Sequence, residues 1–220
     1  MTIQIKFISQ PEYEFNDIEQ QLLSEICRES YEQVAHLLGS INHKVTVNIT
    51  HSPNVIEETG CAGFSWSANQ IIWNIDTNRT EHVIDIAKRH LKPTLYHELN
   101  HLFRGWVMQG ATIDSFMDGV IHEGIAVCFE RDYASSHPLW GIYPENVNEW
   151  VDELLNLTID THPTEWYFEH SDGRRWIAYK TGTYLVDRAM QNGKINACEI
   201  SKLNTSDVLS LAGYSIKVQD

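Results

Sequence analysis

Two histidines four residues apart, with a glutamate after the first, form the most chemically informative segment, His97-Glu98-Leu99-Asn100-His101. Residues i and i+4 of an α-helix share one face, so both imidazoles can reach a single metal ion. Glu98 lies about 100° further round the helix axis, beside such a metal rather than on it. There it can take a proton from a water molecule. The spacing therefore predicts a catalytic zinc site with His97 and His101 as ligands and Glu98 as general base.

A catalytic zinc site needs a third protein ligand and one open coordination position. In one known pattern, Gly and His follow seven and ten residues after the first histidine. Arg104 and Val107 occupy those two positions here, so that pattern does not apply. The third ligand must then come from another part of the chain.

The segment 120–126 offers Glu123, 22 residues beyond His101, on a second expected helix. Its neighbours are apolar, and an unpaired carboxylate would be costly to bury among them. Gly124 beside it would let this helix and the histidine helix approach closely. His122 and Glu130 are the alternatives, and Glu123 is the predicted ligand.

These residues need a scaffold, and the hydrophobic pattern of the chain indicates one. Alternating and apolar runs predict strands first and helices afterwards, which is typical of an α+β fold with a small N-terminal antiparallel or mixed sheet. The expected strands lie at 1–8, at 44–50 and as a pair within 60–76 joined at 67–70. The expected helices lie at 18–38, 80–90, 93–105, 118–133, 144–157, 174–192 and 206–212.

Two boundaries among these elements depend on single residues. Gly39 is expected to end the first helix. Pro93 is expected to open a new helix after residue 90, because proline is tolerated in a first turn and not deep inside a helix. With no linker or repeat in the chain, we expect a single domain over 1–220, sheet-rich over 1–79 and helical over 80–220 with the metal site.

Composition excludes several partner classes. Thirty acidic residues against sixteen basic ones give a net charge of -14, which repels phosphate backbones and disfavours a nucleic-acid partner. No stretch of 18 apolar residues is present, so no membrane span is expected. The sequence makes no prediction of the oligomeric state.

The four cysteines, Cys27, Cys61, Cys128 and Cys198, are scattered without a paired spacing. This disfavours both a disulfide scaffold and a zinc ribbon. Cys128 lies in an apolar run and is expected to be buried. The scattered cysteines and the lack of a signal-peptide pattern at the N-terminus predict a cytoplasmic protein.

Three segments together resemble a known family: His-Glu-Leu-Asn-His-Leu-Phe-Arg104, Glu-Gly-Ile-Ala126 and Ala-Tyr-Lys-Thr-Gly-Thr-Tyr-Leu-Val186. They are similar to the bacterial "predicted zinc-dependent protease" family of gluzincins, distantly related to thermolysin. The resemblance covers roughly residues 60–190, and residues 1–59 add almost nothing to it. It implies a zincin-type helical core, zinc as cofactor, and the ligands His97, His101 and Glu123 with Glu98 as base.

The same resemblance points to Tyr179 as a donor of a hydrogen bond to the developing oxyanion. Tyr184, Tyr167 and His170 compete for that role, and a packed aromatic ring is the simpler interpretation of Tyr179. Asp118 could orient a ligand histidine, but we expect it to be the N-cap of the helix that carries Glu123.

Two classes of function follow from this site. The first is a metallopeptidase that hydrolyses peptides or proteins, whose extended substrate could pair with an edge strand such as 70–75. The second is a non-catalytic zinc-stabilised helical interaction module. Glu98 separates the two, because a structural zinc site has no use for a carboxylate beside the metal. The sequence therefore favours the enzyme.

Overall fold

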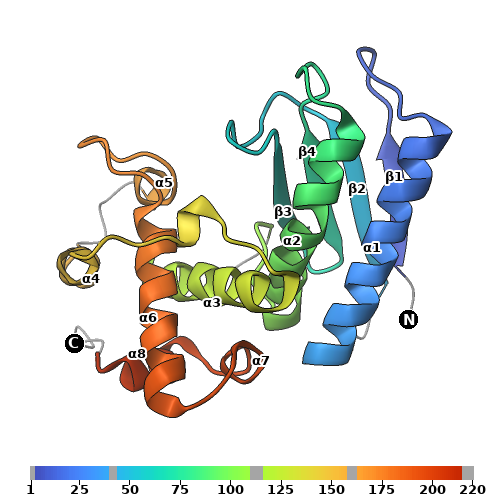
Figure 1. Cartoon of the computed structure of the whole chain (residues 1–220). Helices are drawn as coiled ribbons and strands as arrows, with labels where there is room; N and C mark the ends of the chain where they lie inside the picture. Colours follow the sequence, from blue (N-terminus) through green and yellow to red (C-terminus); the bar gives the residue numbers. More distant parts are fainter. Residues whose placement is uncertain (1–2, 40–43, 110–115, 158–162, 215–220) are drawn as a thin grey trace. The chain divides into compact units, whose positions relative to one another are not determined.

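The computed structural model describes residues 3–39, 44–109, 116–157 and 163–214. The chain divides into two compact units, residues 1–111 and 112–220 (Figure 1). The expectation of a single domain stays a prediction. Within the described ranges, no helix is both long and apolar enough to span a membrane.

A four-stranded mixed sheet forms the base of the first unit. Its strands are β1 (Ile3–Ile8), β2 (Val45–His51), β3 (Cys61–Ser67) and β4 (Gln70–Ile75). Their order across the sheet is β1-β2-β4-β3. β1, β2 and β4 run parallel, and β3 pairs antiparallel with β4. The predicted α+β fold with an N-terminal mixed sheet is confirmed.

The edge of this sheet next to β4 is formed by β3. β4 pairs with β2 on one side and β3 on the other, so the expectation that 70–75 is an edge strand is wrong. The order of strands depends on pairing between distant segments, which local sequence does not encode. The pairing of β3 with β4 also shifts register between Ser65 and Ser67, as at a β-bulge.

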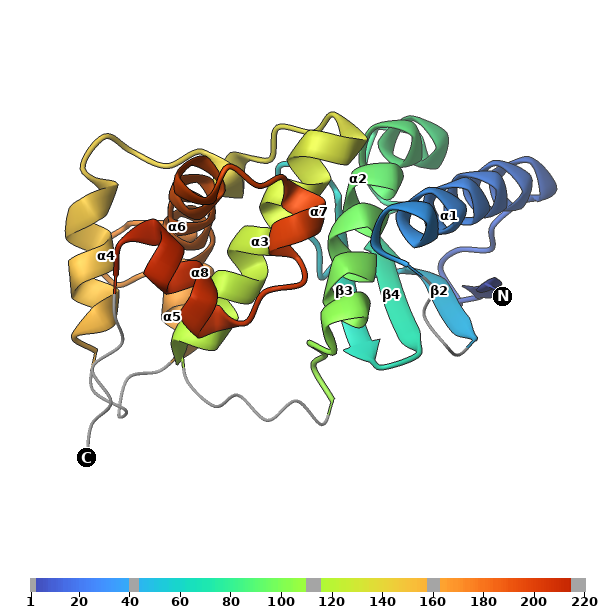
Figure 2. The same ribbon diagram turned by 90° about the horizontal axis from the view of Figure 1, so that it is seen from below.

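Helices α1 (Asp17–Leu38) and α2 (Val83–Arg104) cover one face of the sheet (Figures 1 and 2). α1 begins with a capping box. The Asn16 side chain accepts a hydrogen bond from the backbone of Glu19, and the Glu19 side chain accepts one from the backbone of Asn16, both at 3.0 Å. Gly39, with φ of 96°, ends the helix. Both ends agree with the prediction because both signals are local.

α2 is one continuous helix, so the predicted break at Pro93 is wrong. Pro93 lies inside the helix and removes one of its hydrogen bonds, which costs about 3 kcal/mol in isolation. Ile86 and Leu91 before the proline, and Leu95 and Leu99 after it, are completely buried. Their burial anchors both halves of the helix in the core and offsets the local cost of the proline.

The second unit is built from helices. They are α3 (Phe116–Ala134), η1 (Leu139–Gly141), α4 (Val147–Leu155), α5 (Pro163–Tyr167), α6 (Ile177–Gly193), α7 (Ala197–Ile200) and α8 (Thr205–Ala212). α3, α4, α6 and α8 correspond to predicted helices. The short elements η1, α5 and α7 were not predicted, because segments this brief carry little periodicity.

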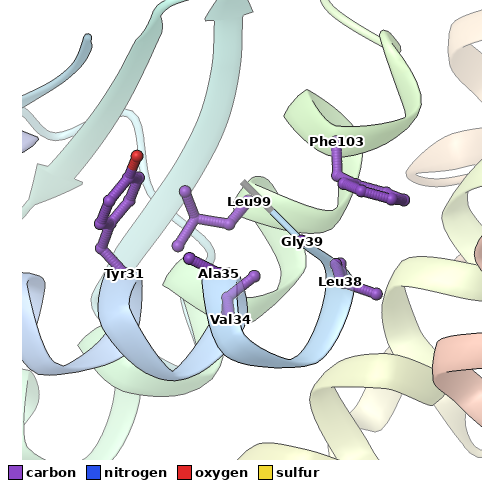
Figure 3. Close-up of a pocket in the computed structure, with 7 residues that line it drawn as sticks. All are labelled: Tyr31, Val34, Ala35, Leu38, Gly39, Leu99 and Phe103. Atoms are coloured by element: carbon purple, nitrogen blue, oxygen red, sulfur yellow. The ribbon is translucent and has the colours of Figure 1, made fainter. Parts of the chain in front are cut away.

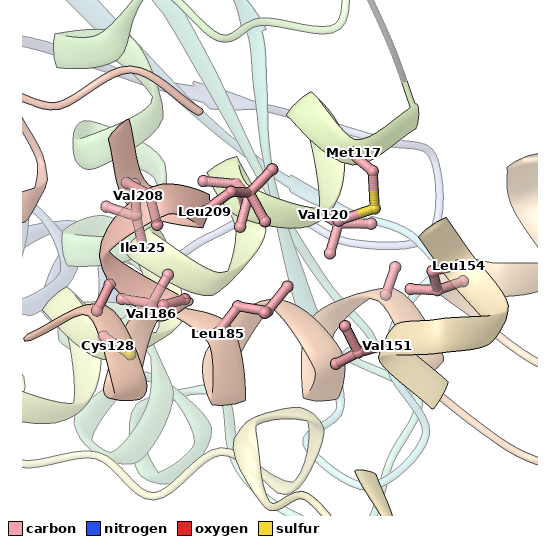
Figure 4. Close-up of a cluster of buried hydrophobic side chains, with 14 of the residues drawn as sticks. Met117, Val120, Ile125, Cys128, Val151, Leu154, Leu185, Val186, Val208 and Leu209 are labelled. Carbon is pink, nitrogen blue, oxygen red and sulfur yellow. The ribbon is translucent and has the colours of Figure 1, made fainter. Parts of the chain in front are cut away.

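The core of the second unit lies between α3, α4, α6 and α8. Figure 4 shows Val120 and Ile125 of α3 meeting Leu185 and Val186 of α6, with Leu209 of α8 beside them. Cys128 is completely buried in the same cluster, as predicted. Gly124 of α3 lies directly against the backbone of α6, and the close approach expected between α3 and the histidine helix stays a prediction. This packing fixes the helix that carries Glu123.

Candidate metal centre

His97 and His101 lie together on α2, as their spacing predicts. Their ring centroids are 4.7 Å apart, and the ring planes meet at 80°. Both side chains are buried, at 6% and 4% exposure. Leu95 and Leu99 of the same helix are completely buried in the core, so the backbone that carries the two imidazoles is firmly anchored. Two adjacent buried imidazoles are suited to sharing one metal ion.

The carboxylate of Glu98 is buried and lies directly against strand β3. The hydroxyl oxygen of Ser65 is 2.8 Å from Glu98 Oε2 and 2.8 Å from the Glu98 carbonyl oxygen. A Cβ atom placed on Gly63 would lie 3.2 Å from Glu98 Oε1. The sheet of the first unit therefore orients this carboxylate.

Sequence reasoning did not identify Ser65 or Gly63 as part of the site. The available signal was two small residues, two positions apart, on the strand expected before the histidine helix. Residues i and i+2 of a strand point to one face, so such a pair makes room for a neighbouring side chain. Serine and glycine are too common for this signal to stand out without the structure.

Glu123 lies on α3 in the second unit and is buried at 8% exposure. Its neighbours Ile121 and Ile125 are completely buried, as the apolar sequence around it predicts. Burial raises the pKa of Tyr167 far above its ordinary value, and the negative charges of Glu123 and Asp118 act in the same direction. Tyr167 is therefore part of the electrostatic surroundings of Glu123.

His97, His101 and Glu123 form a candidate metal-binding group among the described residues. One ligand atom of each lies within 4.8 Å of the others. Two imidazoles and one carboxylate are also a known donor set of catalytic zinc sites, with a fourth position left open. The donors and their burial fit zinc.

His122 and Glu130 are the alternatives to Glu123 as third ligand. His122 is only half-buried. Glu130 is buried and accepts a hydrogen bond from the hydroxyl of Ser136 at 2.7 Å. The candidate metal-binding group contains Glu123 and neither of these two residues.

Tyr179 is half-buried on α6, where its ring meets that of Tyr167 edge to face. The two ring centroids are 6.0 Å apart, with the planes at 85°. Because the electrostatic surroundings of Tyr167 include Glu123, the two tyrosines lie on the part of the second unit that carries this carboxylate. The role of Tyr179 as an oxyanion donor stays a prediction.

Asp118 is not an N-cap. α3 already includes Phe116, so Asp118 lies inside the first turn of the helix, and the expectation of a cap is wrong. A carboxylate is favourable both at the N-cap and, through the helix dipole, in the first turn, so the residue type alone does not separate the two positions. Asp118 acts on Tyr167 in the same direction as Glu123.

His170 lies in the turn that follows α5. Its Nδ1 atom is 3.0 Å from Asp172 Oδ2, and its ring contacts that of Trp166 with centroids 4.5 Å apart and the planes tilted by 42°. Its backbone N–H donates to the carbonyl of Arg174 at 2.8 Å. Asp172 thus faces one ring nitrogen, and the role of His170 as an oxyanion donor stays a prediction.

Tyr184 has its hydroxyl engaged between α4 and α6. The hydroxyl donates to Asn148 and accepts a hydrogen bond from Arg188 at 2.8 Å. The ring of Tyr184 also meets that of Tyr143, with centroids 5.3 Å apart. These contacts give Tyr184 a part in helix packing.

A small hollow between α1 and α2 is a separate feature of the first unit (Figure 3). Its lining comprises Tyr31, Val34, Ala35, Leu38, Gly39, Leu99 and Phe103. The lining is almost entirely apolar and includes neither of the histidines nor Glu98. It offers no donor set for a metal and no group that could act on a substrate.

Comparison with known proteins gives one positive result. A family model described as "predicted Zn-dependent protease" matches residues 23–210. The matched range includes all of the candidate site residues and extends beyond the 60–190 expected from the sequence. No curated protein and no solved structure matches the chain significantly.

Proposed function

Because the chain belongs to the family of predicted zinc-dependent proteases, we propose that it is a zinc metallopeptidase of the gluzincin type that hydrolyses peptide bonds. His97, His101 and Glu123 hold the zinc ion in this proposal, and Glu98 is the general base. The family supplies the reaction class and the metal. The assignment of roles to residues is our own.

The observation that carries the proposal is the position of Glu98. Glu98 directly follows His97 and its carboxylate is buried against strand β3, yet it is not a member of the candidate metal-binding group. Burial of a carboxylate costs free energy unless the group is compensated. A zinc site that only stabilised the fold would gain nothing from this residue. A hydrolase needs a base at this place.

The residues divide the chemistry between them. When bound, zinc supplies a water molecule acidic enough to act near neutral pH and polarises the carbonyl of the substrate. Glu98 takes a proton from the attacking water at Oε1, since Oε2 faces Ser65. Glu98 then passes this proton to the leaving nitrogen. The hydroxyl of Tyr179 donates to the carbonyl oxygen as negative charge develops there.

The decisive experiment combines zinc content with hydrolysis of a quenched fluorescent peptide library. Glu98→Gln is expected to keep one zinc ion per chain and to lose hydrolysis, because the amide cannot take up the proton. His97→Ala is expected to lose both zinc and activity. Exposed residues provide matched controls: Glu32→Gln on α1 and His82→Ala at the start of α2.

The rival function is a non-catalytic zinc module. It requires that wild type binds zinc and hydrolyses no member of the library, and that Glu98→Gln changes nothing. Full turnover by Glu98→Gln on an identified substrate would instead support the enzymatic function and refute the assignment of Glu98 as the base.

A further inference from the structure

We propose that Ser65 is a positioning residue that holds the general base Glu98 in its working orientation, with Gly63 providing the space. The inference rests on the function proposed above. Its physical basis lies wholly within the first unit, between strand β3 and helix α2.

Ser65 contacts Glu98 at both ends of the side chain. Its hydroxyl oxygen is 2.8 Å from the carboxylate oxygen Oε2 and 2.8 Å from the main-chain carbonyl oxygen of the same residue. A hydroxyl has a single proton and can donate it to only one of these acceptors at a time. The paired contacts tie the carboxylate back to its own backbone and restrict rotation about the Glu98 side-chain bonds.

Gly63 defines the other wall of the same place. A Cβ atom there would lie 3.0 Å from Glu98 Cγ and 2.2 Å from Thr94 Cγ2. Any larger residue at this position would push α2 or the Glu98 side chain away from the strand. The absent side chain at Gly63 and the hydroxyl of Ser65 thus shape one slot for one carboxylate.

The strand that carries Ser65 is itself fixed from two sides. Ser65 pairs with Ile71 and Gly63 pairs with Trp73 across the β3–β4 ladder, and both partners are completely buried. On the other side, the carbonyl of Ser65 accepts a hydrogen bond from the N–H of Met108 at 2.9 Å. Ser65 is therefore a rigid point of attachment, as a group that orients a catalytic residue should be.

A merely structural role for Ser65 would predict a different outcome from a positioning role. A hydroxyl that only stabilised the fold would, when removed, lower stability and leave the turnover number of the folded enzyme unchanged. Removal of a positioning hydroxyl lowers kcat, because without it Glu98 samples orientations that do not reach the water. Substrate binding and zinc binding involve other residues and should change little.

The test compares Ser65→Ala, Ser65→Thr and the control Ser67→Ala in the full chain loaded with zinc. Ser67 lies on the same strand, and its hydroxyl donates a hydrogen bond to the side chain of the turn residue Asn69. Ser65→Ala is expected to lower kcat roughly 10- to 100-fold, with KM and zinc content within twofold of wild type. Ser65→Thr keeps the hydroxyl and should restore most of kcat. Ser67→Ala should behave as wild type.

A second measurement does not depend on activity. In the metal-free protein, the urea midpoints of Ser65→Ala, Glu98→Ala and the double variant form a mutant cycle. We expect the double variant to lose less than the sum of the single losses, because either substitution alone removes the contact.

Wild-type kcat in Ser65→Ala would overturn the proposal, as would additive midpoints. A lower kcat that is accompanied by loss of zinc would also overturn it, since the effect would then not act through Glu98. If the mutant cycle gave non-additive midpoints but the wild-type protein hydrolysed no peptide, the proposed function would be refuted. The orientation of Glu98 by Ser65 would still be supported.

Discussion

Gly124 of α3 and Gly182 of α6 are in direct backbone contact. A Cβ atom on Gly124 would lie 2.2 Å from the carbonyl carbon of Gly182, and one on Gly182 would lie 2.1 Å from the carbonyl oxygen of Val120. Both neighbours are main-chain atoms, which cannot rotate away as a side chain can. Because Glu123 directly precedes Gly124, this contact also determines where α3 holds the proposed ligand.

Gly182→Ala is the first prediction. The added methyl group would force α3 and α6 apart, and we expect the free energy of unfolding to fall by about 1–3 kcal/mol. Urea denaturation measures this loss directly. Gly193→Ala in the same helix is the matched control. Its Cβ atom would meet side chains only, at 3.4 Å or more, so the substitution should be neutral or stabilising by about 0.5–1 kcal/mol. Equal effects at both positions would contradict the close-contact explanation.

Removal of zinc is the second prediction. A metal that binds the folded protein stabilises it by mass action, by about 4 kcal/mol when free zinc is 1,000 times its dissociation constant. We therefore expect the thermal midpoint to fall when a chelator is added and to recover when zinc is restored. His101→Ala and Glu123→Ala should each reduce this zinc-dependent shift. An unchanged shift in Glu123→Ala would remove Glu123 from the set of ligands.

Much of the fold and the histidine pair could be predicted because their signals are local. The capping box of Asn16 and Glu19 fixes the start of α1, and the i and i+4 spacing of His97 and His101 places both rings on one face. Neither inference requires knowledge of distant contacts. Local patterns of this kind are readable from a single sequence.

The rest depends on contacts between segments far apart in the chain. The break expected at Pro93 follows a correct local rule, which burial of the helix on both sides of the proline overrides. The central place of β4 follows from its pairing with β2. Ser65 is separated from Glu98 by 33 residues, and a single serine in a strand gives no sign of its partner.

Tyr179→Phe is the third prediction. If its hydroxyl stabilises the oxyanion, kcat should fall roughly 100- to 1,000-fold with little change in KM. Steady-state kinetics on one peptide substrate measures this. Tyr167→Phe tests the competing tyrosine, whose ring contacts that of Tyr179. Tyr184→Phe should alter stability instead, because it removes bonds to Asn148 and Arg188. The largest loss of kcat identifies the donor, and a wild-type kcat in Tyr179→Phe would reject Tyr179.

Alkaline pH should destabilise the protein through Cys27 of α1. Burial raises the pKa of this thiol from 9.0 to about 12. The unfolded chain ionises the thiol first, so the stabilising effect is complete below pH 9 and declines by about 1.4 kcal/mol per pH unit above it. Urea unfolding between pH 8 and pH 10.5 should therefore give a shallower decline in Cys27→Ala than in wild type. Cys198→Ala, at a half-buried position, should change the decline less. Parallel curves for wild type and Cys27→Ala would show that another group, such as a buried tyrosine, dominates the alkaline transition.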